Sequence, residues 1–450
     1  MKVHFIAMGG SAMHNLAIAL HKKGFEVTGS DDVFTEPSKS RLDKFGLLPV
    51  LSGWFPEKII SGLDAVILGM HAKQDNPELL EAQQKGIKIY SYPEYVYEQS
   101  KDKKRIVIGG SHGKTTITSM ILHVLKEASF KFDYLVGAQL EGFDTMVQLT
   151  DAPLIVIEGD EYLASPIDRR PKFHLYQANI GLISGIAWDH INVFPTFESY
   201  LQQFAVFIDT IIANGELIYC EQDRILKKLV TDNTSNVQKI AYSSPEYTID
   251  NGVTSIIYQQ KKYPLKVFGG HNLLNMEAAK TVCKSLGIEE ENFYKAMATF
   301  KGAAKRLELI GSNLQTNVYK DFAHSPSKLS ATINAVKQQF PNRKLIACIE
   351  LHTFSSLNKT FLQEYKSTMD DADQAIVFID NHVLVQKNME PYSAQQVKEA
   401  FNNEDIIFFD QAEDLFAHLK NLNYKNTNLL LMSSGTFAGT DLTGFAETIL

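Results

Sequence analysis

Gly109-Gly110-Ser111-His112-Gly113-Lys114-Thr115-Thr116 is the stretch of this sequence that decides the fold. A strand-like apolar run at 105–108 precedes it, and a helix-like run at 117–128 follows it. Glycines allow backbone N–H groups to close around phosphate oxygens, and the following helix presents its N-terminus to the anion. Lys114 supplies a mobile positive charge, and the Thr115 hydroxyl can ligate Mg²⁺. The pattern predicts a strand, a loop and a helix that bind ATP or GTP.

The loop is a shortened form of the phosphate-binding pattern G-x-x-x-x-G-K-[ST], because Ile108 stands where the first glycine belongs. A glycine turn followed by Lys-Thr can also be a plain connection between a strand and a helix. Signals elsewhere in the chain therefore have to decide between these two interpretations.

Polar residues follow two later strand-like runs and favour the phosphate site. Glu158-Gly159-Asp160-Glu161 follow one such run, and Asp189-His190 follow another. In open parallel sheets, ligands lie beyond the carboxyl ends of the strands. We therefore expect Thr115, Glu158 and His190 to hold Mg²⁺ against the phosphates, although imidazole is an unusual ligand for so hard a cation. Solvated loop caps are the alternative interpretation.

Composition bounds the class of protein. At 450 residues, 44% hydrophobic and 21% charged, the chain has the makeup of an ordinary globular protein. Its net charge of −8, from 44 Lys and Arg against 52 Asp and Glu, argues against a nucleic-acid partner. Three scattered cysteines are expected in the core. No apolar run reaches 18 residues, so we expect no membrane partner and a cytoplasmic protein.

Strand-like runs alternate with helix-like runs, which predicts an α/β fold with parallel sheets covered by helices. We expect three domains: a Rossmann-like N-terminal domain at 1–100, a central P-loop ATPase-type domain with an antiparallel β patch at 101–303, and a Rossmann-like C-terminal domain at 304–450. The charged connector Lys101-Asp102-Lys103-Lys104-Arg105 marks the first boundary. The expected strands are 3–7, 27–30, 65–68, 87–90, 154–157, 180–188, an antiparallel patch at 215–220 and 253–267, and then 318–319, 345–349, 375–379 and 429–432.

A second phosphate-type turn, Ala7-Met8-Gly9-Gly10-Ser11-Ala12, follows the first expected strand and opens a helix. The acidic pair Asp31-Asp32 follows the second strand. This arrangement nearly matches the dinucleotide-binding fingerprint. An NAD site, a nucleotide-sugar diphosphate at the same helix N-terminus and a plain tight turn all stay open from these residues.

Taken together and in this order, the motifs resemble the Mur ligases, ATP-dependent enzymes that join an amino acid or peptide to UDP-N-acetylmuramate. The resemblance covers essentially the whole chain. Two details, Glu161-Tyr162 and Leu431-Met432-Ser433-Ser434-Gly435-Thr436-Phe437, favour the branch that reattaches the recycled tripeptide L-Ala-γ-D-Glu-meso-diaminopimelate in peptidoglycan recycling. The other motifs that carry it are Gly270-His271-Asn272-Leu273-Leu274-Asn275, Lys305-Arg306 and Asp321-Phe322-Ala323-His324-Ser325-Pro326.

The resemblance implies a stepwise reaction. The lactyl carboxylate of UDP-N-acetylmuramate attacks the γ-phosphate of ATP to give an acyl phosphate and ADP, and the tripeptide amine then attacks the acyl carbon and expels phosphate. Cations must offset the repulsion between a carboxylate and a triphosphate. The implied catalytic groups are Lys114, Glu158, His190 and Arg306, with Mg²⁺ on Thr115, Glu158 and His190. The implied ATP-binding residues are Gly110, Ser111, His112, Gly113, Lys114, Thr115, Thr116, Asn272, Asn275, Arg306 and Asp321.

By the same resemblance, the first domain binds the UDP-sugar and the third presents the amine donor. The segment Glu350-Leu351-His352-Thr353-Phe354 lacks the arginine that the family often uses to hold the incoming carboxylate. L-Alanine as donor, in the biosynthetic branch, is therefore the alternative, and a non-catalytic nucleotide-binding regulator is an alternative of another class. The protein is expected to be a monomer or a weak homo-oligomer. The implied sugar-side residues are Gly9, Gly10, Ser11, Asp31, His71 and Asn76, and the implied donor-side residues are His324, His352 and Thr353, with Glu350 as a further candidate.

Overall fold

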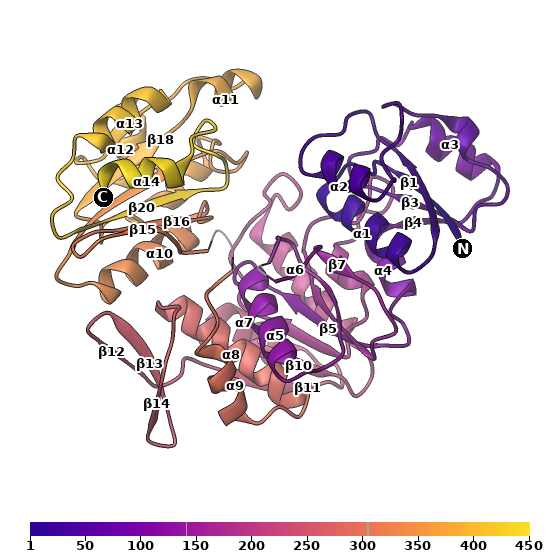
Figure 1. Cartoon of the computed structure of the whole chain (residues 1–450), viewed down its shortest axis with the longest axis horizontal. Coiled ribbons are helices and arrows are strands. Elements are labelled where there is room, and N and C mark those ends of the chain that lie inside the picture. Colours follow the sequence, from indigo (N-terminus) through magenta and orange to yellow (C-terminus); the bar gives the residue numbers. More distant parts are fainter. Residues whose placement is uncertain (141, 304–305) are drawn as a thin grey trace. The chain divides into compact units, whose positions relative to one another are not determined.

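The computed structural model describes residues 1–140, 142–303 and 306–450, which divide into two compact units (Figure 1). The first unit comprises Met1–Ile186, Thr196–Ser243 and Ala278–Glu289. The second comprises Ala187–Pro195, Ser244–Glu277 and Glu290–Leu450. Ala304 and Lys305, at the expected start of the third domain, lie outside the described residues. The three expected domain boundaries stay predictions.

The first unit begins with a parallel sheet in the order β2-β1-β3-β4. β1 (Lys2–Ile6) and β3 (Ala65–Leu68) are almost entirely buried. Parallel strands covered on both faces read as continuous apolar runs, which is why the sequence shows these two clearly. The other elements of this part are β2 (Glu26–Ser30), β4 (Ile89–Ser91), α1 (Ser11–Lys22), α2 (Ser38–Lys44), α3 (Pro77–Gln84) and α4 (Tyr92–Glu98).

A second sheet in the first unit, in the order β11-β10-β9-β5-β8-β6-β7, carries the glycine loop. Its described strands are parallel except for the pair β6 and β7. The expected strand and helix on either side of the loop are confirmed, because β5 (Lys104–Gly109) leads into it and α5 (Lys114–Glu127) leads out. The other elements are β6 (Asp133–Leu135), β7 (Val147–Gln148), β8 (Leu154–Glu158), β9 (Ile180–Ile183), β10 (Glu216–Cys220), β11 (Gln238–Tyr242), α6 (Phe197–Asp209) and α7 (Arg224–Asp232).

Two strand predictions are wrong in this part of the chain. The strand expected at 180–188 ends at Ile183, and the N–H of Ile186 donates instead to the Asp223 carboxylate at 2.7 Å. The strand expected at 215–220 in the antiparallel patch pairs in parallel with β9 and β11. The antiparallel patch belongs to the second unit and consists of β12 (Tyr247–Asp250), β13 (Val253–Tyr258) and β14 (Lys261–Pro264).

The second unit contains a sheet in the order β15-β16-β20-β17-β18-β19, in which only β15 runs antiparallel to its described neighbour. Alternate residues of β17 (Lys344–Glu350) enter two different cores. Ala347 packs with α10 (Pro326–Gln339) and α12 (Ala394–Phe401), and Cys348 packs with α13 (Ala412–Lys420) and α14 (Leu442–Ile449). The sheet is therefore covered on both faces, and the predicted α/β class is confirmed. The remaining elements are β15 (Glu308–Ser312), β16 (Asn317–Asp321), β18 (Gln374–Phe378), β19 (Ile407–Phe409), β20 (Thr427–Ser433), α9 (Glu290–Met297) and α11 (Asn381–Gln386). Helix α8 (Gly270–Ser285) is divided between the units, because its residues up to Glu277 belong to the second and those from Ala278 onward belong to the first.

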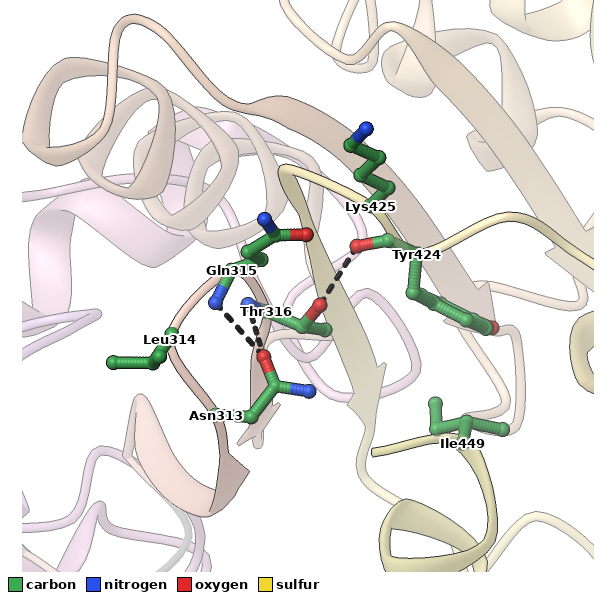
Figure 2. A pocket seen from close by; sticks show the side chains of 7 residues that line it. All are labelled: Asn313, Leu314, Gln315, Thr316, Tyr424, Lys425 and Ile449. Carbon is green, nitrogen blue, oxygen red and sulfur yellow. Dashed lines mark hydrogen bonds between the residues drawn. The ribbon is translucent and has the colours of Figure 1, made fainter.

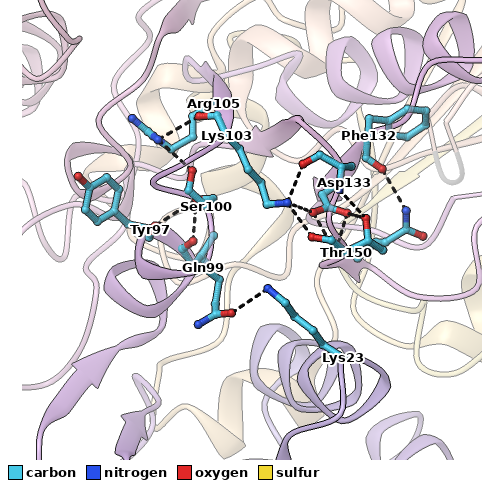
Figure 3. Close-up of polar contacts among 12 residues, drawn as sticks. Lys23, Tyr97, Gln99, Ser100, Lys103, Arg105, Phe132, Asp133 and Thr150 are labelled. Carbon is cyan, nitrogen blue, oxygen red and sulfur yellow. Dashed lines mark hydrogen bonds and ion pairs between the residues drawn. The ribbon is translucent and has the colours of Figure 1, made fainter. Parts of the chain in front are cut away.

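Buried cations fasten the connector between the two sheets of the first unit (Figure 3). Lys103 Nζ lies 2.9 Å from Asp133 Oδ2 and also donates to the carbonyls of Thr150 and Ala152. Arg105 is only 5% exposed, and its guanidinium donates to the carbonyls of Ser100, Lys101, Lys103, Tyr176 and Gln177. The connector is thus bonded into the fold, although its sequence has the charge of a surface linker.

The three cysteines are buried with free thiols, as expected. Among the described residues, no helix has the length and apolar character that crossing a bilayer requires.

Candidate active site

The end of β9 anchors the glycine loop. The Ser184 hydroxyl donates to the His112 carbonyl, and the Ser111 N–H donates to the Gly185 carbonyl at 3.0 Å. Gly110 has a φ of +124°, and a Cβ there would lie 2.1 Å from Ser184 Oγ, so the position requires glycine. The loop is therefore held as a tight turn at the start of α5, which is the geometry that phosphate binding needs.

A buried carboxylate holds Lys114. Its Nζ donates to Glu161 Oε2 at 2.6 Å and to the Gly110 carbonyl at 2.7 Å, and the Glu161 side chain is 1% exposed. Burial alone would lower the pKa of Lys114, but the negative charges of Glu161 and Asp160 raise it above its ordinary value. Lys114 is therefore an ammonium at neutral pH. Sequence reasoning named Lys114 and missed Glu161, although Glu161 lies in the acidic motif.

Thr115 and Glu158, two of the predicted magnesium ligands, lie together. The Thr115 hydroxyl donates to Glu158 Oε1 at 2.8 Å, and the Gly137 N–H donates to Oε2 at 2.8 Å. A hydroxyl and a carboxylate fit Mg²⁺, which takes oxygen ligands and completes its shell with phosphate oxygens and water. Among the described residues, no group of three or more His, Cys, Asp or Glu side chains is placed to hold a metal.

Asp189 and His190 belong to the second unit and lie well past the end of β9. Asp189 Oδ1 accepts a 2.7 Å hydrogen bond from the His190 N–H. Burial would raise the pKa of Asp189, but the neighbouring His190 and the positive charge of Lys328 lower it. The role of His190 as a magnesium ligand stays a prediction.

The remaining predicted nucleotide residues also belong to the second unit. Asn272 is buried on α8 and donates to the Phe268 carbonyl at 2.8 Å, and Asn275 is half-buried on the same helix. Asp321 ends β16, and its carboxylate accepts from the N–H groups of Leu307 at 2.5 Å and Ala323 at 2.7 Å. These bonds shape the turn after the strand, and the roles of all three residues toward a nucleotide stay predictions.

Arg306 and His324 share the ring of Phe322. The Arg306 guanidinium carbon lies 4.6 Å from the centre of that ring, and the His324 ring meets it edge-on at 5.3 Å. His324 Nδ1 donates to the Phe322 carbonyl at 2.8 Å, which leaves Nε2 as an acceptor in the neutral ring. Burial, together with the positive charge of Lys328, lowers the pKa of His324 to about 4. The imidazole is therefore neutral at pH 7.

The predicted donor-side residues follow neighbouring strands of the second unit. β20 pairs with both β16 and β17, so the segments holding His324 and His352 leave the same edge of the sheet. Glu350 is 1% exposed and accepts from the Ser433 hydroxyl and the Phe437 N–H. His352 Nδ1 lies 4.0 Å from Glu350 Oε1 and has no hydrogen-bond partner among the described residues.

Thr353 forms a local turn with Ser356. Its hydroxyl donates to Ser356 Oγ at 2.9 Å and accepts from the Ser356 N–H at 3.1 Å. The role of Thr353 toward an amine donor stays a prediction.

The predicted sugar-side turn gathers at the carboxyl ends of β1, β2 and β3. The Gly9 N–H donates to Asp31 Oδ2 at 2.6 Å, and a Cβ on Gly10 would lie 3.7 Å from the His71 ring. Burial raises the pKa of Asp31 to about 6, the Gly9 hydrogen bond opposes this, and the adjacent Asp32 adds to it. Asp31 therefore shapes the glycine turn itself.

Asn76 has a different place. Its buried side-chain oxygen caps α3 by accepting from the N–H groups of Glu78 and Leu79 at 3.0 and 3.1 Å. The predicted contact of Asn76 with the sugar stays a prediction, beside this structural role.

A chain of hydrogen bonds links the sugar-side turn to the second sheet of the same unit. Asn15 donates to the Ser11 carbonyl at 2.8 Å and accepts from the Met146 N–H at 2.9 Å. The Met146 carbonyl in turn accepts from the Val136 N–H at 3.0 Å, next to the Gly137 that binds Glu158. Nothing in the sequence singles out Asn15 or Met146.

A surface pocket lies at the opposite edge of the second unit's sheet, beside the turn before β16 (Figure 2). Asn313 Oδ1 accepts from the N–H groups of Gln315 and Thr316, and the Thr316 hydroxyl donates to the Tyr424 carbonyl at 2.7 Å. These groups bond within the turn. None of the residues predicted for the active site lines this pocket.

Three segments of the chain match domain models of one protein family. Residues 2–104 match the Mur ligase family catalytic domain, residues 108–283 match the Mur ligase middle domain, and residues 305–435 match the Mur ligase glutamate ligase domain. UDP-N-acetylmuramate–L-alanine ligase from Clostridium kluyveri is 32% identical over 388 residues, which cover 84% of this chain and 82% of that relative.

Two solved structures share the fold. UDP-N-acetylmuramate–alanine ligase from Thermotoga maritima has a TM-score of 0.73 at 20% identity and covers 100% of this chain and 98% of its own. A murein peptide ligase from Psychrobacter arcticus has a TM-score of 0.66 at 20% identity, with the same coverage.

The comparisons correct the expected branch. We expected the tripeptide-recycling activity, and this is wrong, because the matched relatives, in Clostridium kluyveri and Caldicellulosiruptor bescii at 32% identity each, are named as L-alanine ligases. The resemblance to the wider family is confirmed, and with it the expectation of an enzyme. The chain belongs to the Mur ligase family, whose members are ATP-dependent ligases that form carbon–nitrogen bonds.

Proposed function

We propose that this protein is a UDP-N-acetylmuramate–L-alanine ligase. It joins the lactyl carboxylate of UDP-N-acetylmuramate to the amine of L-alanine and converts ATP to ADP and phosphate. The observation that carries the proposal is the 32% identity with L-alanine ligases over 84% of the chain. The arrangement of Lys114, Thr115 and Glu158 around the glycine loop supports the ATP-dependent step.

The first unit activates the carboxylate in this proposal. Lys114 places its positive charge beside the loop, where it offsets the repulsion between the lactyl carboxylate and the γ-phosphate. Thr115 and Glu158 would hold Mg²⁺, and a magnesium ion there would supply positive charge to the phosphates. The glycine turn at Gly9 and Gly10 receives the diphosphate of the sugar nucleotide at the N-terminus of α1.

The second unit presents the amine. The neutral His324 ring offers Nε2 as an acceptor, so it can take a hydrogen bond from the ammonium or amine of L-alanine. Arg306 supplies a fixed positive charge next to it.

Phosphate release tests this proposal. The purified protein is given ATP, Mg²⁺ and UDP-N-acetylmuramate with either L-alanine or the L-Ala-γ-D-Glu-meso-diaminopimelate tripeptide, and the product is weighed by mass spectrometry. We expect release that requires both UDP-N-acetylmuramate and L-alanine, with a product heavier by one alanyl residue. The Lys114→Met variant is the control for contaminating ATPases. Phosphate release with the tripeptide but not with L-alanine would overturn the proposal, and so would the absence of release with both donors.

A further inference from the structure

Tyr200 is a buried tyrosine whose hydroxyl touches two parts of the nucleotide site. It lies on α6 with 0% exposure, and its ring packs edge-on against Phe204 at 5.2 Å. Phenylalanine would fill this space equally well, and a buried hydroxyl costs free energy unless it is hydrogen-bonded. The hydroxyl lies 2.9 Å from Ser111 Oγ and 3.1 Å from Glu161 Oε1.

The chemistry of these groups fixes the direction of the hydrogen bonds. Glu161 pairs with the Lys114 ammonium, so its carboxylate is ionised and can only accept. Tyr200 therefore gives its one proton to Glu161. The bond to Ser111 must then run the other way, from the Ser111 hydroxyl to the Tyr200 oxygen.

This direction has a consequence for the glycine loop. While the chain from Ser111 through Tyr200 to Glu161 is intact, the proton of the Ser111 hydroxyl points to Tyr200 and not to a phosphate oxygen. The other carboxylate oxygen, Glu161 Oε2, holds Lys114. Glu161 therefore contacts Lys114 with one carboxylate oxygen and Tyr200 of α6 with the other, and Tyr200 in turn contacts Ser111 of the glycine loop.

We propose that Tyr200 is a positioning residue of the ATP site, which sets the place of Lys114 by holding Glu161 against Ser111 of the glycine loop. Its side chain is fully buried, and it acts through Glu161 and Ser111. The inference rests on the assignment of the glycine loop to ATP, and it does not depend on which amine the enzyme uses.

The test measures ATP affinity by isothermal titration with Mg²⁺ and no other substrate. We expect Tyr200→Phe to raise the Kd for ATP roughly three- to tenfold, the range that the loss of one hydrogen bond produces. The KM for ATP should rise by the same factor, with the KM for UDP-N-acetylmuramate unchanged. The matched control is Tyr242→Phe, a buried tyrosine of the same unit whose hydroxyl lies against Cys220. Equal Kd values for the two variants would overturn the inference.

A double-mutant cycle separates positioning from direct contact. Ser111→Ala should weaken ATP binding by about the same factor as Tyr200→Phe, and the double variant should be no weaker than the worse single variant. Factors that multiply in the double variant would show that Ser111 and Tyr200 act independently, and would overturn the inference. An unchanged Kd for Ser111→Ala would do the same.

Circular dichroism and thermal unfolding show whether each variant folds. If Tyr200→Phe does not fold, Ser111→Ala and Ser111→Thr decide, because only threonine keeps the hydroxyl. We expect the alanine variant to bind ATP more weakly and the threonine variant to keep the wild-type affinity. Equal Kd values for ATP in these two variants would overturn the inference. Because these titrations contain no amine, a wild-type enzyme that binds ATP but does not use L-alanine would sink the proposed donor and leave this inference standing.

Discussion

The Thr115 hydroxyl donates a 2.8 Å hydrogen bond to Oε1 of Glu158, across the interval between the first turn of α5 and the end of β8. The hydroxyl proton therefore points to the carboxylate, and the oxygen lone pairs of Thr115 are left for a cation. The Gly137 N–H occupies the other carboxylate oxygen. Each oxygen of Glu158 therefore accepts a hydrogen bond, and an N–H group in the place of either oxygen would face another donor.

This arrangement predicts the effect of Glu158→Gln. The amide nitrogen would face either the Thr115 hydroxyl or the Gly137 N–H, and the charge that attracts Mg²⁺ would be lost. We expect phosphate release to fall by roughly a hundredfold and to need more Mg²⁺. Glu216→Gln is the control, since that carboxylate accepts from the Ser285 hydroxyl, which lies outside the glycine loop. Activity that follows the same Mg²⁺ dependence in both variants would contradict the prediction.

Gly110 should tolerate no side chain, for a reason that Gly86 does not share. Both have a positive φ, +124° and +64°, but a Cβ meets nothing within 4 Å at Gly86 and lies 2.1 Å from Ser184 Oγ at Gly110. Gly86→Ala should cost about 1 kcal/mol of unfolding free energy and leave ATP binding intact. Gly110→Ala should abolish ATP binding as measured by titration. Wild-type affinity in Gly110→Ala would show that the loop is not held as described.

Arg105 should matter for stability and not for chemistry. Arg105→Met leaves several buried carbonyls without donors, and we expect the free energy of unfolding to fall by about 3 kcal/mol or more in urea titrations. Lys101→Met removes only a surface ion pair with Glu98 and should change stability by less than about 0.5 kcal/mol. Similar losses in the two variants would mean that the connector is less firmly bonded than its geometry indicates.

His324 predicts a pH dependence of stability. Its pKa of about 4 in the folded protein lies below the ordinary 6.5, so the unfolded chain binds more protons between these values. Stability should therefore fall as the pH drops from about 6.5 toward 4, by at most about 3 kcal/mol from this group. His324→Asn should flatten that part of the curve, with unfolding followed by urea at each pH. NMR titration of the wild-type ring gives a direct check, and a midpoint near 6.5 would refute the shift.

The sequence predicted the parts of the fold that depend on local pattern. Apolar runs such as 65–68 became strands, because strands buried on both faces have no polar alternation to obscure them. The run at 180–188 was overextended because Ile186, Ala187 and Trp188 are apolar too. Beyond β9 the Ile186 N–H donates to Asp223, a residue 37 positions away, and no local pattern contains such a contact.

In the candidate site, too, local patterns predicted some residues, and contacts distant in the sequence decided others. Lys114, Thr115 and Glu158 follow from the motif and from the rule that ligands lie at strand ends, and the structure brings Thr115 and Glu158 together. Tyr200 could not be found, because an aromatic residue on the apolar face of a helix is the ordinary sign of a core position. His324 and His352 follow neighbouring strands, as the strand-end rule predicts, but their roles toward an amine donor stay predictions, and the proposal of L-alanine comes from the relatives.

The hydrogen bonds from Ser11 through Asn15 to Met146 bear on how this enzyme can be engineered. A chimera that exchanges the N-terminal domain at the connector would bring a new residue at position 15 to the N–H of residue 146, which stays behind. Grafts that carry 136–147 along with the exchanged domain would keep the partner pair matched. An exchange that keeps both sides of this contact therefore needs two separate segments of the chain, 1–100 and 136–147.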